Sequence, residues 1–403
     1  MEFPIKDKSA CSACFACKVS CPKGAIDERS DSRGFLYPFI DPEKCVDCGI
    51  CTKVCPAEGE AEKREPLSVY AARSIVTDIK RSASGGVFAA LAKFTLEQGG
   101  SVFGAAMERG ESGFEIYHKE VTDIQQLYGI CSSKYVQSSA SECYGTVKKC
   151  LEEGRRVLFS GTPCQIAALY SFLKGREYEN LLTADLVCHG IPSPALFNSY
   201  ISFLEKRYKA EVTGFTFRDK SLGGGHNGSL ILKYPSGREK RITVYSAESS
   251  YYHYFLSGAS FRDSCYACRY ACPERVGDVT LGDYWGFDSE HPELAGRGFD
   301  SFEGVSCLMV NTEKGKRAVE SALSLLHTSS TDYERVRAHN GQLNNPSKPS
   351  PGREALWREY EKAGYEGVER MFSKSRGKKY LLVKIYNRLP FSLKKGIKRA
   401  LKG

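Results

Sequence analysis

The residues with the clearest chemistry are cysteines in the first 56 positions. Two runs follow the same spacing, C-x2-C-x2-C-x3-C-P, and comprise Cys11, Cys14, Cys17 and Cys21, then Cys45, Cys48, Cys51 and Cys55. Thiolates bind iron, and a [4Fe–4S] cluster takes four of them, one for each iron. The doubled spacing therefore predicts two [4Fe–4S] clusters.

This spacing is typical of two-cluster ferredoxins, in which the fourth cysteine of each run binds the other cluster. The predicted ligands of one cluster are Cys11, Cys14, Cys17 and Cys55. Those of the second cluster are Cys45, Cys48, Cys51 and Cys21. A disulfide framework is disfavoured because Met1-Glu2-Phe3 leads straight into the motif without a secretion signal. A zinc site is also disfavoured, because zinc prefers separated C-x2-C pairs.

The composition is that of a globular protein. The chain has 403 residues, of which 41% are hydrophobic and 26% are charged. No apolar run approaches the roughly 20 residues that span a bilayer. Seventeen cysteines without a secretion signal indicate a reducing compartment. We therefore expect a cytoplasmic protein.

Positive charge is concentrated at the C-terminal end. Between Lys374 and Lys402 there are eleven Lys and Arg and no acidic residue. Subtracting these from the total of 57 leaves 46 basic against 48 acidic residues. Apolar residues are interspersed among the basic ones, a pattern that suits docking on an anionic membrane surface or on a partner. The alternative is a solvated basic terminus, and we expect no nucleic-acid binding.

The order of predicted elements defines the fold class. Residues 1–60 are predicted to form the ferredoxin-like domain. From residue 67 to residue 330, strands alternate with helices, which predicts an α/β domain with a largely parallel sheet. We divide it into parts 67–165 and 166–330, the second containing a further cysteine group. Residues 331–403 are predicted to be a helical, basic tail. The overall class is therefore α+β and α/β combined.

Two polar turns are candidate cofactor contacts. Ser84, Gly85 and Gly86 precede an apolar helix, and the amides at such a helix start can bind a phosphate. Small residues also cap helices for purely structural reasons. The second turn contains Lys134 and Tyr135, a cation and an aromatic ring that could bind a cofactor; the alternative is an ordinary surface turn.

A third cysteine group lies far from the first two. Cys265, Cys268 and Cys272 provide three thiols, which leaves one iron of a cube without a ligand. Cys164 and Cys188 are the best-placed further donors, since each follows a predicted strand at a glycine-containing turn. Three or four of these five cysteines could complete a third cluster.

Several motifs in this order, SASGGVFAAL, SKYVQS, GTPCQ, CHGIPSP and CYACRYACPERVGDVTLGDYWG, resemble the coenzyme F420 hydrogenase/dehydrogenase beta-subunit family. The resemblance implies a flavin, usually FAD, whose phosphates contact Ser84, Gly85 and Gly86. It implies that Lys134, Tyr135, Gly161 and Thr162 line the flavin site. It also implies a cluster held by Cys164, Cys188, Cys265 and Cys268. Cys272 departs from the family pattern and is an alternative to Cys188 or Cys164.

These features predict an iron–sulfur flavoprotein oxidoreductase. A flavin exchanges electrons singly or in pairs, whereas a cluster exchanges one at a time, so the two together can connect a one-electron carrier to a two-electron substrate. The substrate is a small molecule that the sequence does not identify. His189 is the first candidate for a catalytic proton donor, ahead of Asp283 and His253. The alternative is a non-catalytic electron-transfer subunit that serves a redox partner protein; a third possibility is an assembly protein.

Overall fold

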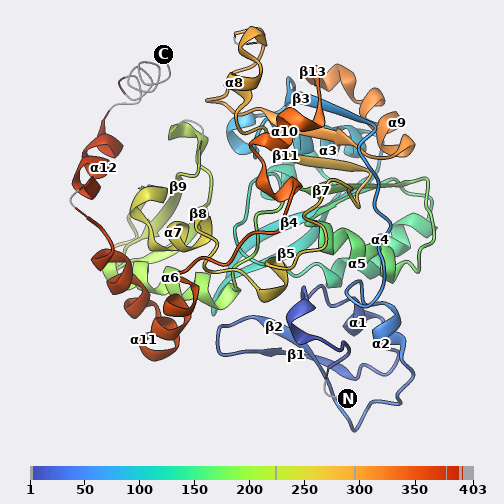
Figure 1. Ribbon diagram of the computed structural model, residues 1–403, viewed down its shortest axis with the longest axis horizontal. Coiled ribbons are helices and arrows are strands. Elements are labelled where there is room, and N and C mark those ends of the chain that lie inside the picture. Colours follow the sequence, from blue (N-terminus) through green and yellow to red (C-terminus); the bar gives the residue numbers. More distant parts are fainter. Residues whose placement is uncertain (1–2, 223–224, 295, 378, 390–392, 394–403) are drawn as a thin grey trace.

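The computed structural model describes residues 3–222, 225–294, 296–377, 379–389 and 393 (Figure 1). Its N-terminal domain contains an antiparallel hairpin of β1 (Ile26–Ser30) and β2 (Leu36–Ile40). Two short helices, α1 (Ala16–Val19) and α2 (Ile50–Lys53), each contain the third cysteine of a run. The duplicated cysteine spacing is therefore accompanied by a duplicated helix.

An eight-stranded mixed sheet forms the centre of the molecule, in the order β13-β3-β12-β11-β7-β6-β4-β5. Its strands are β3 (Ser68–Ser74), β4 (Ser101–Gly110), β5 (Gly113–Val121), β6 (Val157–Gly161), β7 (Leu181–Leu186), β11 (Val279–Asp283), β12 (Ser306–Val310) and β13 (Leu326–Thr331). The central pairs β11/β7, β7/β6 and β6/β4 are parallel, and the pairs towards both edges are antiparallel. The prediction of a largely parallel sheet is correct only for this centre, because the β4–β5 hairpin and the returning strand β12 add antiparallel pairs.

Helices cover both faces of this sheet. On one face lie α4 (Ser141–Glu152) and α5 (Pro163–Phe172), and on the other lie α3 (Val87–Glu97) and α9 (Glu313–Ser321). Side chains of a strand alternate between the faces. In β6, Val157 and Phe159 accordingly pack with α4 and α5, whereas Leu158 packs with α3. The three-layer α/β domain thus contains strands from both predicted parts, 67–165 and 166–330.

A second, smaller sheet consists of β8 (Glu211–Thr216), β9 (Gly228–Lys233) and β10 (Glu239–Val244), all antiparallel. The helices associated with it are α6 (Pro194–Tyr208), α7 (Ser250–Leu256) and α11 (Arg353–Lys374). Their shared core is aromatic and includes Phe197, Phe215 and Tyr251.

The remaining helices are α8 (Phe287–Glu290), α10 (Tyr333–Ala338) and α12 (Lys379–Arg388). α10, α11 and α12 all lie in the predicted tail 331–403, which also contains the end of β13 and a non-helical loop at 344–352. Residues 390–392 and 394–403 of that tail, like residues 1–2 of the predicted N-terminal domain, lie outside the described residues.

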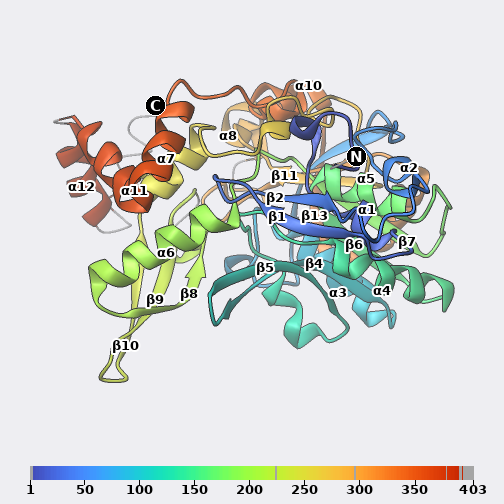
Figure 2. The same ribbon diagram turned by 90° about the horizontal axis from the view of Figure 1, so that it is seen from below.

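The N-terminal domain rests on the α4/α5 side of the main sheet (Figures 1 and 2). Ala16 and Cys17 of α1 share a core with Tyr144 of α4. The connecting segment is also held in place, because Arg64 and Arg275 exchange two backbone hydrogen bonds of 2.8 Å. This contact brings the segment that carries the third cysteine group next to the N-terminal domain.

Candidate redox site

The two N-terminal cysteine runs share one backbone conformation. The residues on either side of the second cysteine are left-handed in both runs, with φ of 50° at Ala13 and 53° at Phe15, and 51° at Asp47 and 69° at Gly49. This conformation is unfavourable for a residue with a bulky side chain such as Phe15. The spacing therefore encodes a specific strained loop, present twice.

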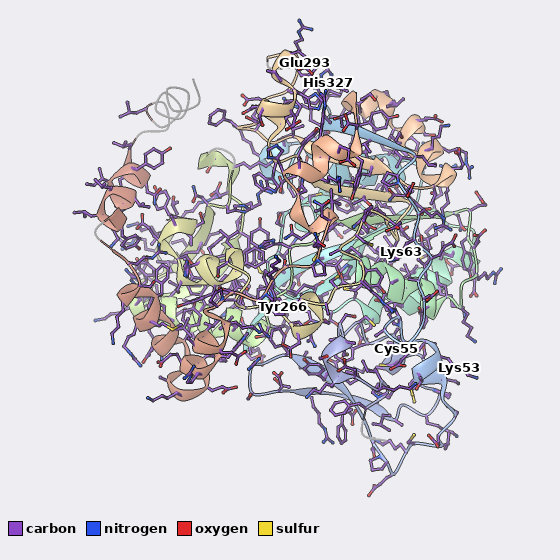
Figure 3. The ribbon with its side chains drawn as sticks, viewed as in Figure 1. Lys53, Cys55, Lys63, Tyr266, Glu293 and His327 are labelled. Atoms are coloured by element: carbon purple, nitrogen blue, oxygen red, sulfur yellow. The ribbon has the colours of Figure 1, made fainter. Side chains whose placement is uncertain are left out.

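The structure brings the fourth cysteine of the second run to the first run. Burial raises the pKa of the Cys14 thiol to about 12, and the charges of Cys11 and Cys55 add to the rise. Burial also raises the pKa of Cys17 far above its ordinary value, with the same neighbours contributing. Cys55 lies where the N-terminal domain faces the α/β domain (Figure 3). Such thiolates are disfavoured unless a cation such as iron binds them.

The other four N-terminal cysteines are more accessible. Cys45 and Cys48 are exposed, and Cys21 and Cys51 are partly buried. The amide of Ala25 donates to Cys21 Sγ at 3.3 Å, a contact that stabilises a thiolate. This group therefore lies at the accessible end of the domain, where a redox partner can reach it.

Cys164, Cys188, Cys265 and Cys268 line one cavity of about 260 Å³. Cys164 is in the first turn of α5, directly after β6, and Cys188 follows β7, so the parallel centre of the sheet places both at one edge. Burial raises the pKa of Cys188 well above its ordinary value, and the charges of the other three thiols act in the same direction. These four cysteines are thus neighbours, although more than 100 residues separate the first from the last.

Cys272 lies beside this group, and its charge contributes to the raised pKa of Cys268. Its sulfur contacts the carbonyl oxygens of Arg269 and Glu274 at 3.4 and 3.3 Å, and Lys63 Nζ lies 3.6 Å away. It does not line the 260 Å³ cavity. Among the described residues, no three His, Cys, Asp or Glu side chains converge on the position of a single metal ion. A cubane does not need such convergence, because each thiolate binds a different iron.

The cavity adjoins the N-terminal cysteines. Its wall includes Ala10, Pro56 and Ala57 of the N-terminal domain. The charge of Cys164 contributes to the raised pKa of Cys14, which shows that the two sulfur groups are close. Burial raises the pKa of Tyr270 far above its ordinary value, and both of these thiols contribute to that rise.

A buried arginine lies between the two cysteine groups. Arg262 is only 1% exposed and lines the 260 Å³ cavity. Its guanidinium donates to Leu36 O at 2.8 Å, Gln137 Oε1 at 2.9 Å and Cys11 O at 3.5 Å. All of these acceptors are neutral. A buried charge surrounded by neutral groups is costly unless a counter-charge is near, and cysteine-bound clusters are anionic.

A second cavity of about 480 Å³ lies on the other side of Cys188. The segment from Cys188 to Ile191 lines both cavities. The predicted flavin contacts that line the second one are Ser84, Lys134, Tyr135, Gly161 and Thr162. Its volume is that of a small-molecule or cofactor site.

Gly85 and Gly86 do not line this cavity. The amide of Gly85 donates to Ser306 Oγ at 2.8 Å, and that of Gly86 donates to Ala83 O at 3.0 Å. A Cβ atom at position 85 would lie 2.5 Å from Ala72 O. Close packing therefore explains Gly85, and the left-handed φ of 77° explains Gly86. Ser84 and the following helix start remain at the cavity wall.

Lys134 and Tyr135 enter the cavity wall from one loop. Lys134 Nζ donates to Gly129 O at 3.0 Å, and desolvation lowers the pKa of this lysine to about 8. The Tyr135 ring stacks on Phe255 at 4.4 Å, and its hydroxyl lies 3.2 Å from His226 Nδ1. The loop thus presents one fixed aromatic ring and one cation that pairs with no carboxylate among the described residues.

Three candidate proton donors have different positions. His189 lines both cavities, and desolvation lowers its pKa. Asp283 lines the 480 Å³ cavity and forms an ion pair with Arg218. His253 lines neither cavity and packs against Phe372 at 5.3 Å. His189 therefore remains the first candidate for the proton donor, because it lines both cavities.

The sequence analysis missed His118, a buried residue on β5 that also lines the 480 Å³ cavity. Its Nε2 lies 2.9 Å from Ser160 O, so this nitrogen carries the proton that the carbonyl accepts. In the neutral ring, Nδ1 then accepts from Ser138 Oγ at 3.2 Å. Burial lowers the pKa of His118 to about 4. A lone histidine in a strand has no motif that would reveal this role.

His118 should make the protein sensitive to acid. Its pKa of about 4 in the folded state lies below the ordinary 6.5, so the unfolded state binds more protons between these values and stability falls as the pH decreases. From pH 7.5 to pH 5 we expect a loss of about 2 kcal/mol from this residue alone. Denaturant unfolding of His118→Gln should show a correspondingly weaker pH dependence. The control is His327→Gln, which should retain the full dependence because His327 (Figure 3) lines neither cavity. An unchanged slope in His118→Gln would contradict the assignment.

Among the described residues, no helix is long and apolar enough to cross a membrane.

Comparison with known proteins finds two family models that match different parts of this chain. Residues 10–58 match the 4Fe-4S dicluster domain, and residues 154–333 match the C terminus of the coenzyme F420 hydrogenase/dehydrogenase beta subunit. The chain is 25% identical over 330 residues to the coenzyme F420-dependent sulfite reductase of Methanocaldococcus jannaschii, covering 78% of this chain and 47% of that protein. It therefore spans about half the length of this relative.

Two further similarities cover different parts. Pyruvate synthase subunit PorD of Methanothermobacter marburgensis is 36% identical over 62 residues, covering 15% of this chain and 67% of PorD. A chain of the F420-reducing [NiFe] hydrogenase complex of Methanosarcina barkeri superposes with a TM-score of 0.43 at 14% identity, covering 77% of this chain and 92% of that chain. The sequence matches thus place a segment similar to the 4Fe-4S dicluster domain before a segment similar to the C terminus of the coenzyme F420 hydrogenase/dehydrogenase beta subunit.

Proposed function

We propose that this protein is an iron–sulfur flavoprotein oxidoreductase that connects a one-electron carrier to a two-electron substrate. The observation that carries the proposal is the position of the four-cysteine cavity. It touches the N-terminal domain on one side and shares Cys188 with the 480 Å³ cavity on the other. Electrons that enter at the accessible cysteines could thus reach the larger cavity through adjacent groups.

Cys164, Cys188, Cys265 and Cys268 are the proposed ligands of a third [4Fe–4S] cluster. Their thiols share one buried cavity, and Cys272 lies outside it. Arg262 supports the assignment, because an anionic cluster on either side would supply the counter-charge that its neutral neighbours lack. When bound, the cluster would supply one-electron transfer. The protein would contribute the thiolates, the dry surroundings and the buried positive charge.

FAD is the proposed occupant of the 480 Å³ cavity. The wall combines apolar side chains, among them Val87, Phe88 and Leu281, with a few polar groups, as cofactor sites do. Lys134 is a desolvated cation that a phosphate group would complement. A bound flavin would supply the exchange between one- and two-electron steps. His118 would present a fixed neutral ring, and His189 could accept a proton between the two cavities.

Replacing Lys134 with methionine tests the flavin site directly. We expect the Kd of FAD to rise about 10-fold or more, because a hydrogen bond to a charged group contributes about 1.5–3 kcal/mol. Riboflavin lacks the phosphates, so its affinity should change little. Both can be measured by quenching of flavin fluorescence on the iron–sulfur-loaded protein. The control is Lys119→Met, whose lysine pairs with Glu108 rather than facing the cavity. An equal loss for both flavins would contradict a phosphate contact.

The second candidate function is a non-catalytic electron-transfer subunit. The exposed Cys45 and Cys48 would suit contact with a partner protein, and the chain spans only 47% of its sulfite reductase relative. Wild-type protein that holds its clusters but binds no FAD would favour this candidate. If FAD binds, coenzyme F420, which is named in the family and in this relative, is the first two-electron carrier to test.

A further inference from the structure

The helix α12 exposes apolar side chains that contact nothing in the described structure's core. Leu381, Leu382 and Ile385 are 65%, 66% and 53% exposed. Positions 381 and 385 are one helical turn apart, and position 382 adjoins them, so the three side chains form one apolar side. Singly exposed apolar residues are ordinary, whereas a contiguous set on one helix indicates an interaction surface.

The opposite side of α12 is held by the body of the protein. Asn387 is on this side, and its Nδ2 donates to the carboxylate of Glu248 at 2.9 Å. Arg388 lies next to the apolar side, and its long side chain reaches the same carboxylate at 3.0 Å. Asn387 is buried, at 9% exposure. These contacts fix the rotation of the helix about its axis, so its apolar side faces away from the body.

The C-terminal segment that contains α12 is strongly positively charged. The stretch from Lys374 to Lys402 holds eleven basic and no acidic residues, whereas the rest of the chain has 46 basic and 48 acidic residues. Eight of the eleven are lysines, whose long side chains can reach lipid headgroups while aliphatic neighbours enter the bilayer. Basic residues near an anionic membrane surface are attracted to it electrostatically. Positive charge and exposed aliphatic side chains together match an anionic bilayer.

We propose that α12 docks the protein on an anionic lipid bilayer, with the helix lying in the plane of the interface. Its 10 residues extend about 15 Å, half of the roughly 30 Å hydrocarbon core, so it lies on the bilayer and does not span it. Both ribbon views place α12 at the end of the molecule away from the N-terminal domain (Figures 1 and 2). The docked protein therefore keeps its accessible cysteines free for a redox partner.

Vesicle sedimentation of the full-length, iron-loaded protein tests this proposal. Phosphatidylcholine vesicles are compared with vesicles in which about a third of the lipid is phosphatidylglycerol. We expect at least tenfold stronger binding to the anionic vesicles, and we expect high salt to abolish the difference, because the attraction between charges is screened. The variant Leu381→Ser/Leu382→Ser/Ile385→Ser should lose at least tenfold of this binding at unchanged iron content, because α12 then has no apolar side to insert.

The matched control changes three exposed apolar residues elsewhere, Leu67→Ser/Ile75→Ser/Leu323→Ser, and should bind like the wild type. Equal binding to both kinds of vesicle, or equal loss in both triple variants, would overturn the proposal. So would an α12 variant that binds vesicles normally but changes the mass of the protein in solution, since this outcome would assign the surface to contact with a protein or a second copy of the chain.

Discussion

Cys188→Ala is expected to reduce the iron content from about twelve to about eight atoms per chain, because a cube that loses a thiolate in this cavity loses its anchor while the two N-terminal cubes remain. Cys188 is the informative position because it lines both cavities. The iron assay should be joined to electron paramagnetic resonance of the reduced protein. The spectrum should lose the signal of the third cluster. It should keep the signals of the two coupled clusters in the N-terminal domain.

Cys272→Ala is the matched control for this experiment. Cys272 lies in the same loop as Cys265 and Cys268, yet its sulfur faces carbonyl oxygens and Lys63. We expect it to retain about twelve irons. If Cys272→Ala loses four irons and Cys188→Ala loses none, the ligand assignment is wrong. If the wild type itself holds about eight, there is no third cluster.

Arg275→Met is expected to lower the free energy of unfolding by about 3–5 kcal/mol, the cost of leaving one partner of a buried ion pair alone. Arg275 and Asp185 are 1% and 0% exposed and lie 3.0 Å apart. The same guanidinium donates to Tyr270 O at 2.9 Å. It therefore holds the third cysteine loop against β7, and the variant should also bind its third cluster more weakly.

The expected loss of unfolding free energy can be compared with the loss caused by breaking an exposed ion pair. Arg317 and Glu179 form an ion pair at 2.9 Å with side chains 59% and 85% exposed, and Arg317→Met should cost no more than about 1 kcal/mol. Denaturant unfolding of the anaerobic holoprotein gives both values. The double variant Arg275→Met/Asp185→Leu should regain part of the loss, because it removes both buried charges. Similar costs for the two single arginine variants would refute a structural role for the buried pair.

The sequence was sufficient wherever the chemistry depends on neighbours in the chain. The spacing of the N-terminal cysteines predicts cluster loops, and the backbone repeats at Ala13 and Asp47 because the loop conformation is local. The alternation of strands and helices predicts an α/β domain for the same reason. The direction of the edge strands was less predictable, because β12 pairs with β3, more than 200 residues away.

The sequence was insufficient wherever the contact is between distant segments. Cys272 is close in sequence to Cys265 and Cys268. The cavity that Cys265 and Cys268 line is nevertheless completed by Cys164 and Cys188, which follow the paired strands β6 and β7. Gly85 looked like a phosphate contact, but the approach of Ala72 explains it. His118 has no motif at all, and only the sheet brings it to the cavity.

Two cysteine runs with ferredoxin spacing, a third cysteine group and a basic C-terminal end can all be read from the order of residues, because covalent order and short loops specify these features. The packed fold was needed to show which cysteines share a cavity, that Arg262 is buried beside them, and that the apolar side of α12 is exposed. Each of these depends on segments that meet only when the sheet and its helices pack, since burial and charge neighbours are properties of the packed chain.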